Sequence, residues 1–372
     1  MTQPGSGDNG SGGREEFAVA GDGKEQRKPP HVIRQGFLKD RISDRKNNLD
    51  FIRFVAAVMV LFSHSWPLTT GSNNTEPLAL ATRYQLDFGA LAVDIFFIVS
   101  GFLVTQSFDR SRNVLTFAKA RFLRIVPGLF VVIIILALIL GPVVTSFSSS
   151  QYWGAFPFAS LIGDHLPGVF VATPYSGAVD GSLWTIKYEI LCYVMVGLLG
   201  FLSVLTNRYV MVALWIFSMT PIGTHYSLNL LPFFATGMLY YAFRRYVPIK
   251  GGVAVIALFL GVASLLVNES RWVIPLTLGY LILWFAYTPR IRFSGFSRYG
   301  DWSYGIYIYA FPVQQMLVQY AGIRQPLVLF AASLPITLLS AALSWHLVEK
   351  NALKLKKVPL FPAFLTSSRT GG

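Results

Sequence analysis

The strongest constraint on the fold is a series of long apolar segments separated by short polar ones. A helix that crosses the ~30 Å hydrocarbon core of a bilayer needs about 20 mostly apolar residues. The chain of 372 residues is 53% hydrophobic and 13% charged, and a soluble domain carries about 25% charged residues. The sequence therefore predicts an all-α fold, a polytopic membrane helical bundle. Ten segments are expected to cross: 49–68, 87–107, 124–146, 182–204, 208–223, 227–243, 251–267, 272–288, 300–320 and 326–348.

The distribution of basic residues predicts how these segments are oriented. The net charge of +13 would suit a nucleic-acid-binding protein, but the Lys and Arg side chains lie in the short segments between apolar runs. Such residues favour the cytoplasmic side of a membrane. With ten spans and both termini cytoplasmic, 26 of the 31 Lys and Arg residues fall in cytoplasmic segments and 3 in external ones. This asymmetry indicates a multi-pass protein of the plasma (inner) membrane.

Three regions follow from this map. Residues 1–47 are rich in Gly, Ser and charged side chains and are predicted to be a disordered, basic cytoplasmic tail. Residues 48–349 form the transmembrane domain, and residues 350–372 form a second cytoplasmic tail. The segment 152–173, aromatic and rich in Pro, is expected to be an external interfacial or re-entrant loop.

The first apolar segment carries an ionisable side chain near each end. Arg53 and His64 are eleven residues apart, so on a helix they share one face, separated by about 16 Å along the axis. Ionisable groups inside a bilayer are costly and usually functional. The alternative is that both lie near the interfaces, with Arg53 extending toward headgroups. We favour a polar path through the protein.

On this topology two clusters of ionisable side chains are expected. An outer cluster contains His64, Asp94 and Glu189. A neutral imidazole can take a proton from a hydroxyl, and a carboxylate can orient the ring and stabilise the imidazolium. The sequence does not show which acid is the partner of His64. The alternative to a catalytic cluster is that these groups are simply solvated at the external interface.

The inner cluster contains Arg53, Arg121 and Arg124, whose guanidinium groups bind phosphate oxygens well. Alternatively, these arginines belong to the general excess of Lys and Arg on the cytoplasmic side of membrane proteins and have no binding role. Beside this path, Ser100 and Gly101 are small residues that favour close helix packing or close approach of a substrate over a serine nucleophile. We group both with the inner arginines as candidate donor-binding residues. The remaining histidines show no metal-ligand spacing, so no metal and no tightly bound cofactor are expected.

Six segments, taken in order, resemble motifs of the membrane acyltransferase family 3, the integral-membrane O-acyltransferases that modify extracytoplasmic glycans. The first is Leu49, Asp50, Arg53 and His64 in the opening span. The others lie at 93–103, 121–127, 182–193, 304–307 and 345–349, so the resemblance extends from about 48 to 350.

This resemblance implies a membrane-bound O-acyltransferase. The donor would be an acyl-coenzyme A such as acetyl-CoA, bound from the cytoplasm by the inner arginines. The acceptor would be a hydroxyl of an extracytoplasmic glycan or lipid-linked saccharide, such as an exopolysaccharide or lipopolysaccharide. His64 would deprotonate that hydroxyl or relay the acyl group, assisted by Glu189 or Asp94. The runner-up hypothesis is a proton-coupled transporter of sugars or organic acids, and a third is a non-catalytic scaffold in polysaccharide export.

Overall fold

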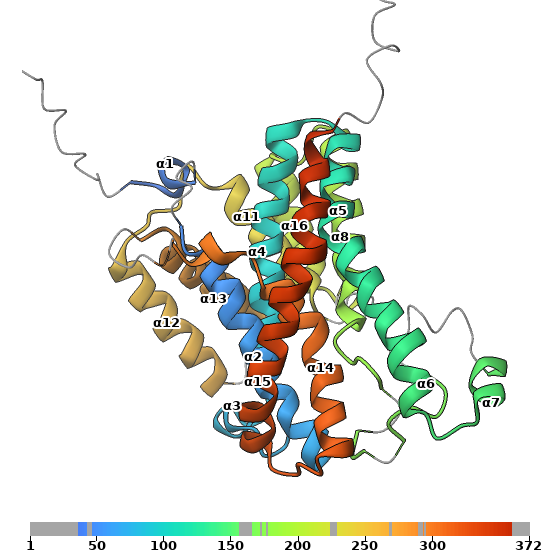
Figure 1. Ribbon diagram of the computed structural model, residues 1–372. Coiled ribbons are helices and arrows are strands. Elements are labelled where there is room, and N and C mark those ends of the chain that lie inside the picture. The colour runs from blue at the N-terminus through green and yellow to red at the C-terminus, as the bar shows by residue number, and fades with distance from the viewer. Residues whose placement is uncertain are drawn as a thin grey trace, which may run out of the picture. The chain divides into compact units, whose positions relative to one another are not determined.

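The computed structural model describes residues 36–42, 47–155, 166–171, 173–175, 178–223, 229–267, 270–288, 293 and 295–358. Nearly all secondary structure in these residues is helical (Figure 1). The only β-type contact among them is an isolated bridge between Phe37 and Pro248.

The first long helix, α2 (Leu49–Thr70), carries both Arg53 and His64. It ends at Gly71, whose φ of +81° is a left-handed conformation that glycine adopts without strain. The short helix α3 (Pro77–Ala81) follows, and its N-cap Glu76 accepts a hydrogen bond from the amide of Ala79 at 2.8 Å. The Glu76 side chain therefore stabilises the start of α3.

Capping side chains set the beginnings of the next two long helices. Asp87 caps α4 (Phe88–Ser111) by accepting from the amide of Ala90 at 2.7 Å. Asn113 caps α5 (Val114–Ile134) in the same way. Because of this cap, α5 begins ten residues before the predicted start at 124, so Arg121 and Arg124 lie inside the helix rather than at its start. The helix continues through the π-helical turn η1 (Ile135–Leu140) into α6 (Gly141–Val144).

The remaining helices complete the part of the chain that the structure describes. They are α1 (Leu38–Arg41), α7 (Ser149–Gly154), α8 (Trp184–Phe201), α9 (Arg208–Met219), α11 (Leu231–Ala242), α12 (Gly251–Leu266), α13 (Ser270–Tyr287), η3 (Phe296–Tyr299), α14 (Ser303–Tyr320), α15 (Pro326–Ser344), η4 (Trp345–Glu349), α16 (Lys350–Lys354) and η5 (Leu355–Lys357).

Helix α4 is the centre of the packing. It contacts α2, α5, α8, α11 and α13, and about half of its length is buried. Its closest neighbour is α11, where Gly101 on α4 and Gly237 on α11 face each other. A Cβ atom at Gly101 would collide with the carbonyl oxygen of Phe234, and one at Gly237 would collide with that of Ile98. Small residues at this crossing let the two backbones approach closely.

The helices confirm the predicted all-α fold in the described residues, while the ten crossings stay a prediction. Five helical segments in the described residues are long and apolar enough to cross. The other predicted spans also coincide with helices, but α9 and α11 have 12 residues each, or about 18 Å at 1.5 Å per residue. The five segments are Leu49–Thr70, Phe88–Ser111, Val114–Val144, Trp184–Phe201 and Pro326–Lys357.

Both predicted tails are partly packed. Most of the first lies outside the described residues, but Leu38 in α1 is fully buried and its amide donates to the carbonyl of Val247 at 2.8 Å. The second tail was predicted to begin at 350, whereas the last long helix continues to Lys357. The predicted loop 152–173 lies outside the described residues at 156–165 and 172; in the rest of it, Tyr152, Val169 and Phe170 are buried.

Candidate active site

A cavity of about 500 Å³ opens among α2, α4, α5, α8 and α14. We call it the basic cavity, because four cationic side chains line it: Arg53, Arg121, Arg124 and Lys356. Its size lies within the range of about 300–1,000 Å³ typical of sites for small ligands. The carboxylates of Asp50, Glu189 and Asp301 also line it, so the cavity combines anion-binding groups with their counter-charges.

Asp301 joins two of these arginines. One of its carboxylate oxygens accepts from Arg53 Nη1 and from Arg124 Nη2, each at 2.5 Å. The other oxygen accepts from the hydroxyl of Ser303 at 2.5 Å. The three charged side chains are 15–19% exposed, so water screens this cluster only weakly.

The charge of Asp301 is stabilised by the cluster. Two guanidinium groups and one hydroxyl donate to this carboxylate, and such charge-assisted contacts favour its ionised form. Arg53 and Arg124 are held in fixed positions at the wall of the basic cavity.

Arg121 and Lys356 are in a different situation. Neither forms an ion pair with a carboxylate within the described ranges, and the Nε of Arg121 is buried without a hydrogen-bond partner there. The Arg121 guanidinium lies 5.7 Å from the ring centre of Tyr193, a cation–π contact that fixes its orientation. These two cations are the anion-binding groups of the cavity whose charge is not already matched.

Glu189 lies in the same cavity. Its carboxylate accepts hydrogen bonds from the hydroxyl of Tyr193 and from that of Ser100, the latter at 3.3 Å. Ser100 therefore has a carboxylate at its own depth in the bundle, which the sequence did not reveal. The pair links α4 to α8 across the cavity.

A second cavity of about 570 Å³ contains His64 and is called the histidine cavity. Its ionisable lining residues are His64, Asp87, Asp94 and Arg271. It extends between the end of α2, the start of α4, and residues of α11 and α13. Asp94 is 7% exposed, so a carboxylate lies buried in the wall of this cavity.

The imidazole of His64 forms no hydrogen bond with the described residues. Its Nδ1 is buried and has no hydrogen-bond partner among the described residues. The ring stands edge-on to Phe311, with ring centres 5.2 Å apart, so its orientation is restricted. Asp87 and Asp94 line the same cavity. An imidazole in a cavity that also contains carboxylates is suited to accepting a proton from a bound hydroxyl.

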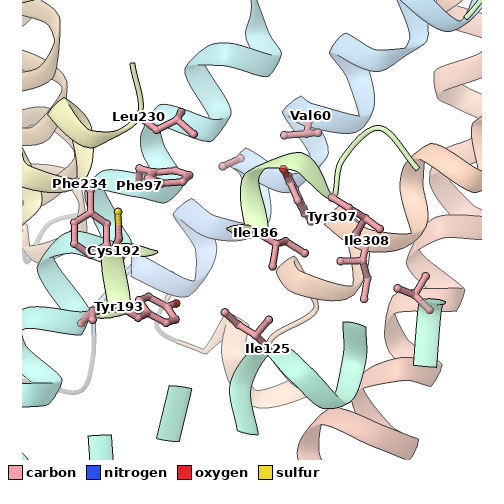
Figure 2. Close-up of a cluster of buried hydrophobic side chains, with 14 of the residues drawn as sticks. Val60, Phe97, Ile125, Ile186, Cys192, Tyr193, Leu230, Phe234, Tyr307 and Ile308 are labelled. Atoms are coloured by element: carbon pink, nitrogen blue, oxygen red, sulfur yellow. The ribbon is translucent and has the colours of Figure 1, made fainter. Parts of the chain in front are cut away.

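Val93 on α4 and Tyr307 on α14 line both cavities, so these side chains form the wall that the two cavities share, and we call this place the junction. The hydroxyl of Tyr307 donates to the carbonyl of Ser182 at 2.8 Å and also contacts the hydroxyl of Thr185 at 2.6 Å. Figure 2 shows its ring with Val60 of α2 and Ile186 of α8 in the same buried cluster. A small reacting group at this junction would face the basic cavity on one side and the histidine cavity on the other.

Comparison with known proteins matches residues 46–346 to a family whose model is described as an acyltransferase domain. The match covers more than half of the chain. The chain belongs to this acyltransferase family. The resemblance found in the sequence motifs is thereby confirmed at the level of the family.

Two relatives of this acyltransferase match over most of its length. An O-acetyl transferase of Shigella phage Sf6 is 29% identical over 343 residues, covering 83% of this chain and 96% of the phage protein. Nodulation protein 10 of Rhizobium leguminosarum bv. viciae is 31% identical over 367 residues, covering 86% of this chain and 97% of that protein. No solved structure gives a significant match.

The acyltransferase brings together most, but not all, of the site residues predicted from the sequence. Arg53, Arg121 and Arg124 line one cavity together with Ser100. His64 and Asp94 line the other. The predicted outer cluster is divided, since Glu189 belongs to the basic cavity.

Gly101 departs from its assignment to the donor path. It is not among the residues lining the basic cavity; it packs against α11, as its contact with Phe234 shows. Adjacent helical residues point about 100° apart. Ser100 can therefore face the cavity while Gly101 faces the neighbouring helix.

Three residues important to this geometry were not singled out from the sequence: Asp301, Tyr307 and Lys356. Asp301 follows a predicted cytoplasmic segment, and its only sequence signal is that it is an acid at the start of an apolar run. Tyr307 lies in a motif that was quoted without a role. In the part of the chain that the structure describes, no group of three or more His, Cys, Asp or Glu side chains is placed to hold a metal ion.

Proposed function

We propose that this acyltransferase transfers an acyl group, most simply acetyl, from acyl-coenzyme A to a hydroxyl of an extracytoplasmic glycan. The observation that carries the proposal is that the two cavities lie on either side of one wall, formed by Val93 and Tyr307. One cavity offers cations for a phosphorylated donor, and the other is lined by the imidazole of His64.

Donor binding is assigned to the basic cavity. Arg121 and Lys356 have no carboxylate partner within the described ranges and would meet the phosphate groups of coenzyme A, since charge-assisted contacts to phosphate are strong. Arg53 and Arg124, held by Asp301, would add positive potential and their remaining N–H donors. The thioester end of the donor would extend toward Val93 and Tyr307.

In the proposed reaction the acceptor oxygen attacks the thioester carbonyl carbon. A C–O bond forms and the C–S bond breaks. The proton of the hydroxyl moves to the His64 imidazole and then to the departing thiolate, so that the products are an ester and free coenzyme A. Asp94 and Asp87, which line the same cavity, would stabilise the imidazolium while it exists.

The proposal also assigns sides of the membrane. The asymmetry of Lys and Arg supports ten crossings with both termini in the cytoplasm of a plasma-membrane protein. On that topology the basic cavity opens to cytoplasmic acyl-CoA and the histidine cavity opens to the external glycan. The printed name of the phage relative, O-acetyl transferase, supports an acetyl group and an oxygen acceptor.

Sealed inside-out vesicles carrying glycan in their lumen test the proposal directly. Labelled acetyl-CoA is added outside, and alkali-labile label on lumenal glycan is measured. Transfer by vesicles with the wild-type protein, and none by vesicles without it, is the expected result. Uptake of sugar or organic acid driven by a proton gradient, with no ester formed, would instead favour a transporter that uses His64 and Asp94 as a proton relay.

A further inference from the structure

A third, apolar pocket adjoins the basic cavity. It has a volume of about 230 Å³ and is lined by residues of α8, by Phe217 of α9 and by Leu230 and Leu231 at the start of α11. Its lining is almost entirely hydrocarbon, with Leu191, Met195 and Phe217 among its walls. Phe97 lines both this pocket and the basic cavity, so its ring is the wall that they share.

Phe97 lies next to the junction of the two main cavities. It follows Val93 by four residues on α4, so the two side chains lie on one face of the helix, one turn apart. A thioester that reaches the junction at Val93 and Tyr307 would therefore hold its acyl chain beside the Phe97 ring.

The Phe97 side chain is held firmly in this position. It is 5% exposed and belongs to the main hydrophobic cluster. Its ring meets that of Phe234 on α11 nearly edge-on, with centres 6.5 Å apart. Figure 2 shows it together with Leu230, Phe234 and Cys192 on the side of the cluster that carries the apolar pocket. A ring packed on several sides cannot swing aside without opening a void, which dense protein interiors disfavour.

We propose that Phe97 determines acyl-chain length by closing the basic cavity against this pocket and so restricting transfer to short acyl groups. The inference rests on the proposed function, because it concerns the same donor. Truncating Phe97 would join the pocket to the basic cavity and admit the hydrocarbon tail of a longer acyl-CoA. The chemistry is unchanged: a longer thioester is cleaved, a longer ester forms on the glycan, and coenzyme A is released.

The test compares wild-type protein with Phe97→Ala in membrane vesicles supplied with acetyl-CoA or hexanoyl-CoA. Apolar pockets discriminate about 10–200-fold for one methylene group. The ratio of hexanoyl to acetyl transfer is therefore expected to rise at least about tenfold in Phe97→Ala. A wild-type protein that transfers both groups equally, or a ratio that Phe97→Ala leaves unchanged, would overturn the inference.

Two further variants make the result specific to this wall. Leu230 lines the apolar pocket and the histidine cavity, but not the basic cavity. Leu230→Ala therefore opens the same pocket to the other side and should leave the acyl ratio unchanged. Adding Met195→Trp to Phe97→Ala fills the pocket and should restore the preference for acetyl. A raised ratio in Leu230→Ala, or no restoration by Met195→Trp, would count against the assignment.

Phe97→Leu removes less of the ring and serves as the second variant if Phe97→Ala does not accumulate in the membrane. It is expected to raise the ratio in the same direction. The outcomes also separate this inference from the proposed function. A wild-type protein that transfers no acetyl group refutes the function, whereas normal acetyl transfer with an unmoved acyl ratio refutes only the role of Phe97.

Discussion

The two cavities differ in whether their buried ionisable side chains have partners within the protein. In the basic cavity, Arg53 and Arg124 share the carboxylate of Asp301, and Glu189 accepts hydrogen bonds from Ser100 and Tyr193. In the histidine cavity, the Nδ1 of His64 has no partner among the described residues, and no hydrogen bond to Asp94 is found there. Most charges of the basic cavity are matched within the protein, with Arg121 and Lys356 among the exceptions in the described residues. An imidazole without a partner instead keeps its reactivity for the substrate.

Removing the imidazole tests this contrast most severely. His64→Ala is expected to lower ester formation by about 10²–10⁴-fold, since that is the usual contribution of a general base. Donor affinity should hardly change, because His64 does not line the basic cavity. Labelled glycan ester at matched protein levels is the measurement, and the exposed His346→Ala is the control. Wild-type ester levels in His64→Ala would refute the role of the imidazole.

Removing the shared carboxylate tests the stability of the basic cavity. Asp301→Asn leaves two guanidinium groups without their counter-charge and is expected to lower the free energy of unfolding by about 3–5 kcal/mol. Thermal unfolding in detergent measures the effect. Asp50→Asn is the matched control, because Asp50 lines the same cavity without an ion pair in the described segments. Equal unfolding midpoints for the two variants would show that the Asp301 cluster is not structural.

The unmatched cations of the basic cavity should govern donor affinity. Arg121→Ala is expected to raise the donor KM by about tenfold or more, the loss of one charge-assisted contact of about 1.5–3 kcal/mol. Arg124→Ala should raise the donor KM and also destabilise the fold, because Asp301 loses a partner. Initial rates at varied acetyl-CoA measure this, with Lys119→Ala as control. An unchanged KM in Arg121→Ala would place the phosphates elsewhere.

Asp94 and Glu189 line different cavities, so their substitutions are expected to have different and smaller effects. Asp94→Asn is expected to lower kcat by about tenfold with little change in donor KM, since Asp94 shares the cavity of His64. Glu189→Gln should instead change the donor KM, since it rearranges Ser100 and Tyr193. The reverse pattern would identify Glu189 as the acid that assists His64.

The helices could be predicted from the sequence, and so could the position of Arg53 and His64 on one helix. Both follow from periodicity within a single segment. The apolar runs at 49–68, 87–107 and 326–348 each contain a helix that the structure shows. Arg53 and His64 do lie on α2 and line the two cavities that share a wall. Local patterns of this kind need no knowledge of how distant segments pack.

What sequence reasoning missed depends on long-range packing. The ion pair between Arg53 and Asp301 joins residues 248 positions apart in the chain, and no local sequence pattern predicts it. Glu189 was assigned to the outer cluster because α8 was assumed to begin at the membrane surface. The segment before α8 is buried instead, with Asp180 and Ser182 at most 1% exposed. Glu189 lines the basic cavity together with Arg121 and Arg124, a proximity that counting along α8 alone cannot show.

The sharing of Asp301 by Arg53 and Arg124 has a consequence for synthesis of the chain in the cell. Translation at about 5–20 residues per second needs roughly 10–50 s to produce the 248 residues between Arg53 and its acid. During that interval the first helix must stay in the membrane with its cation uncompensated, or be shielded by the insertion machinery. Assembly is then completed only when the last helices arrive, so chains that stop before Asp301 should be recognised and degraded rather than accumulate as partial bundles.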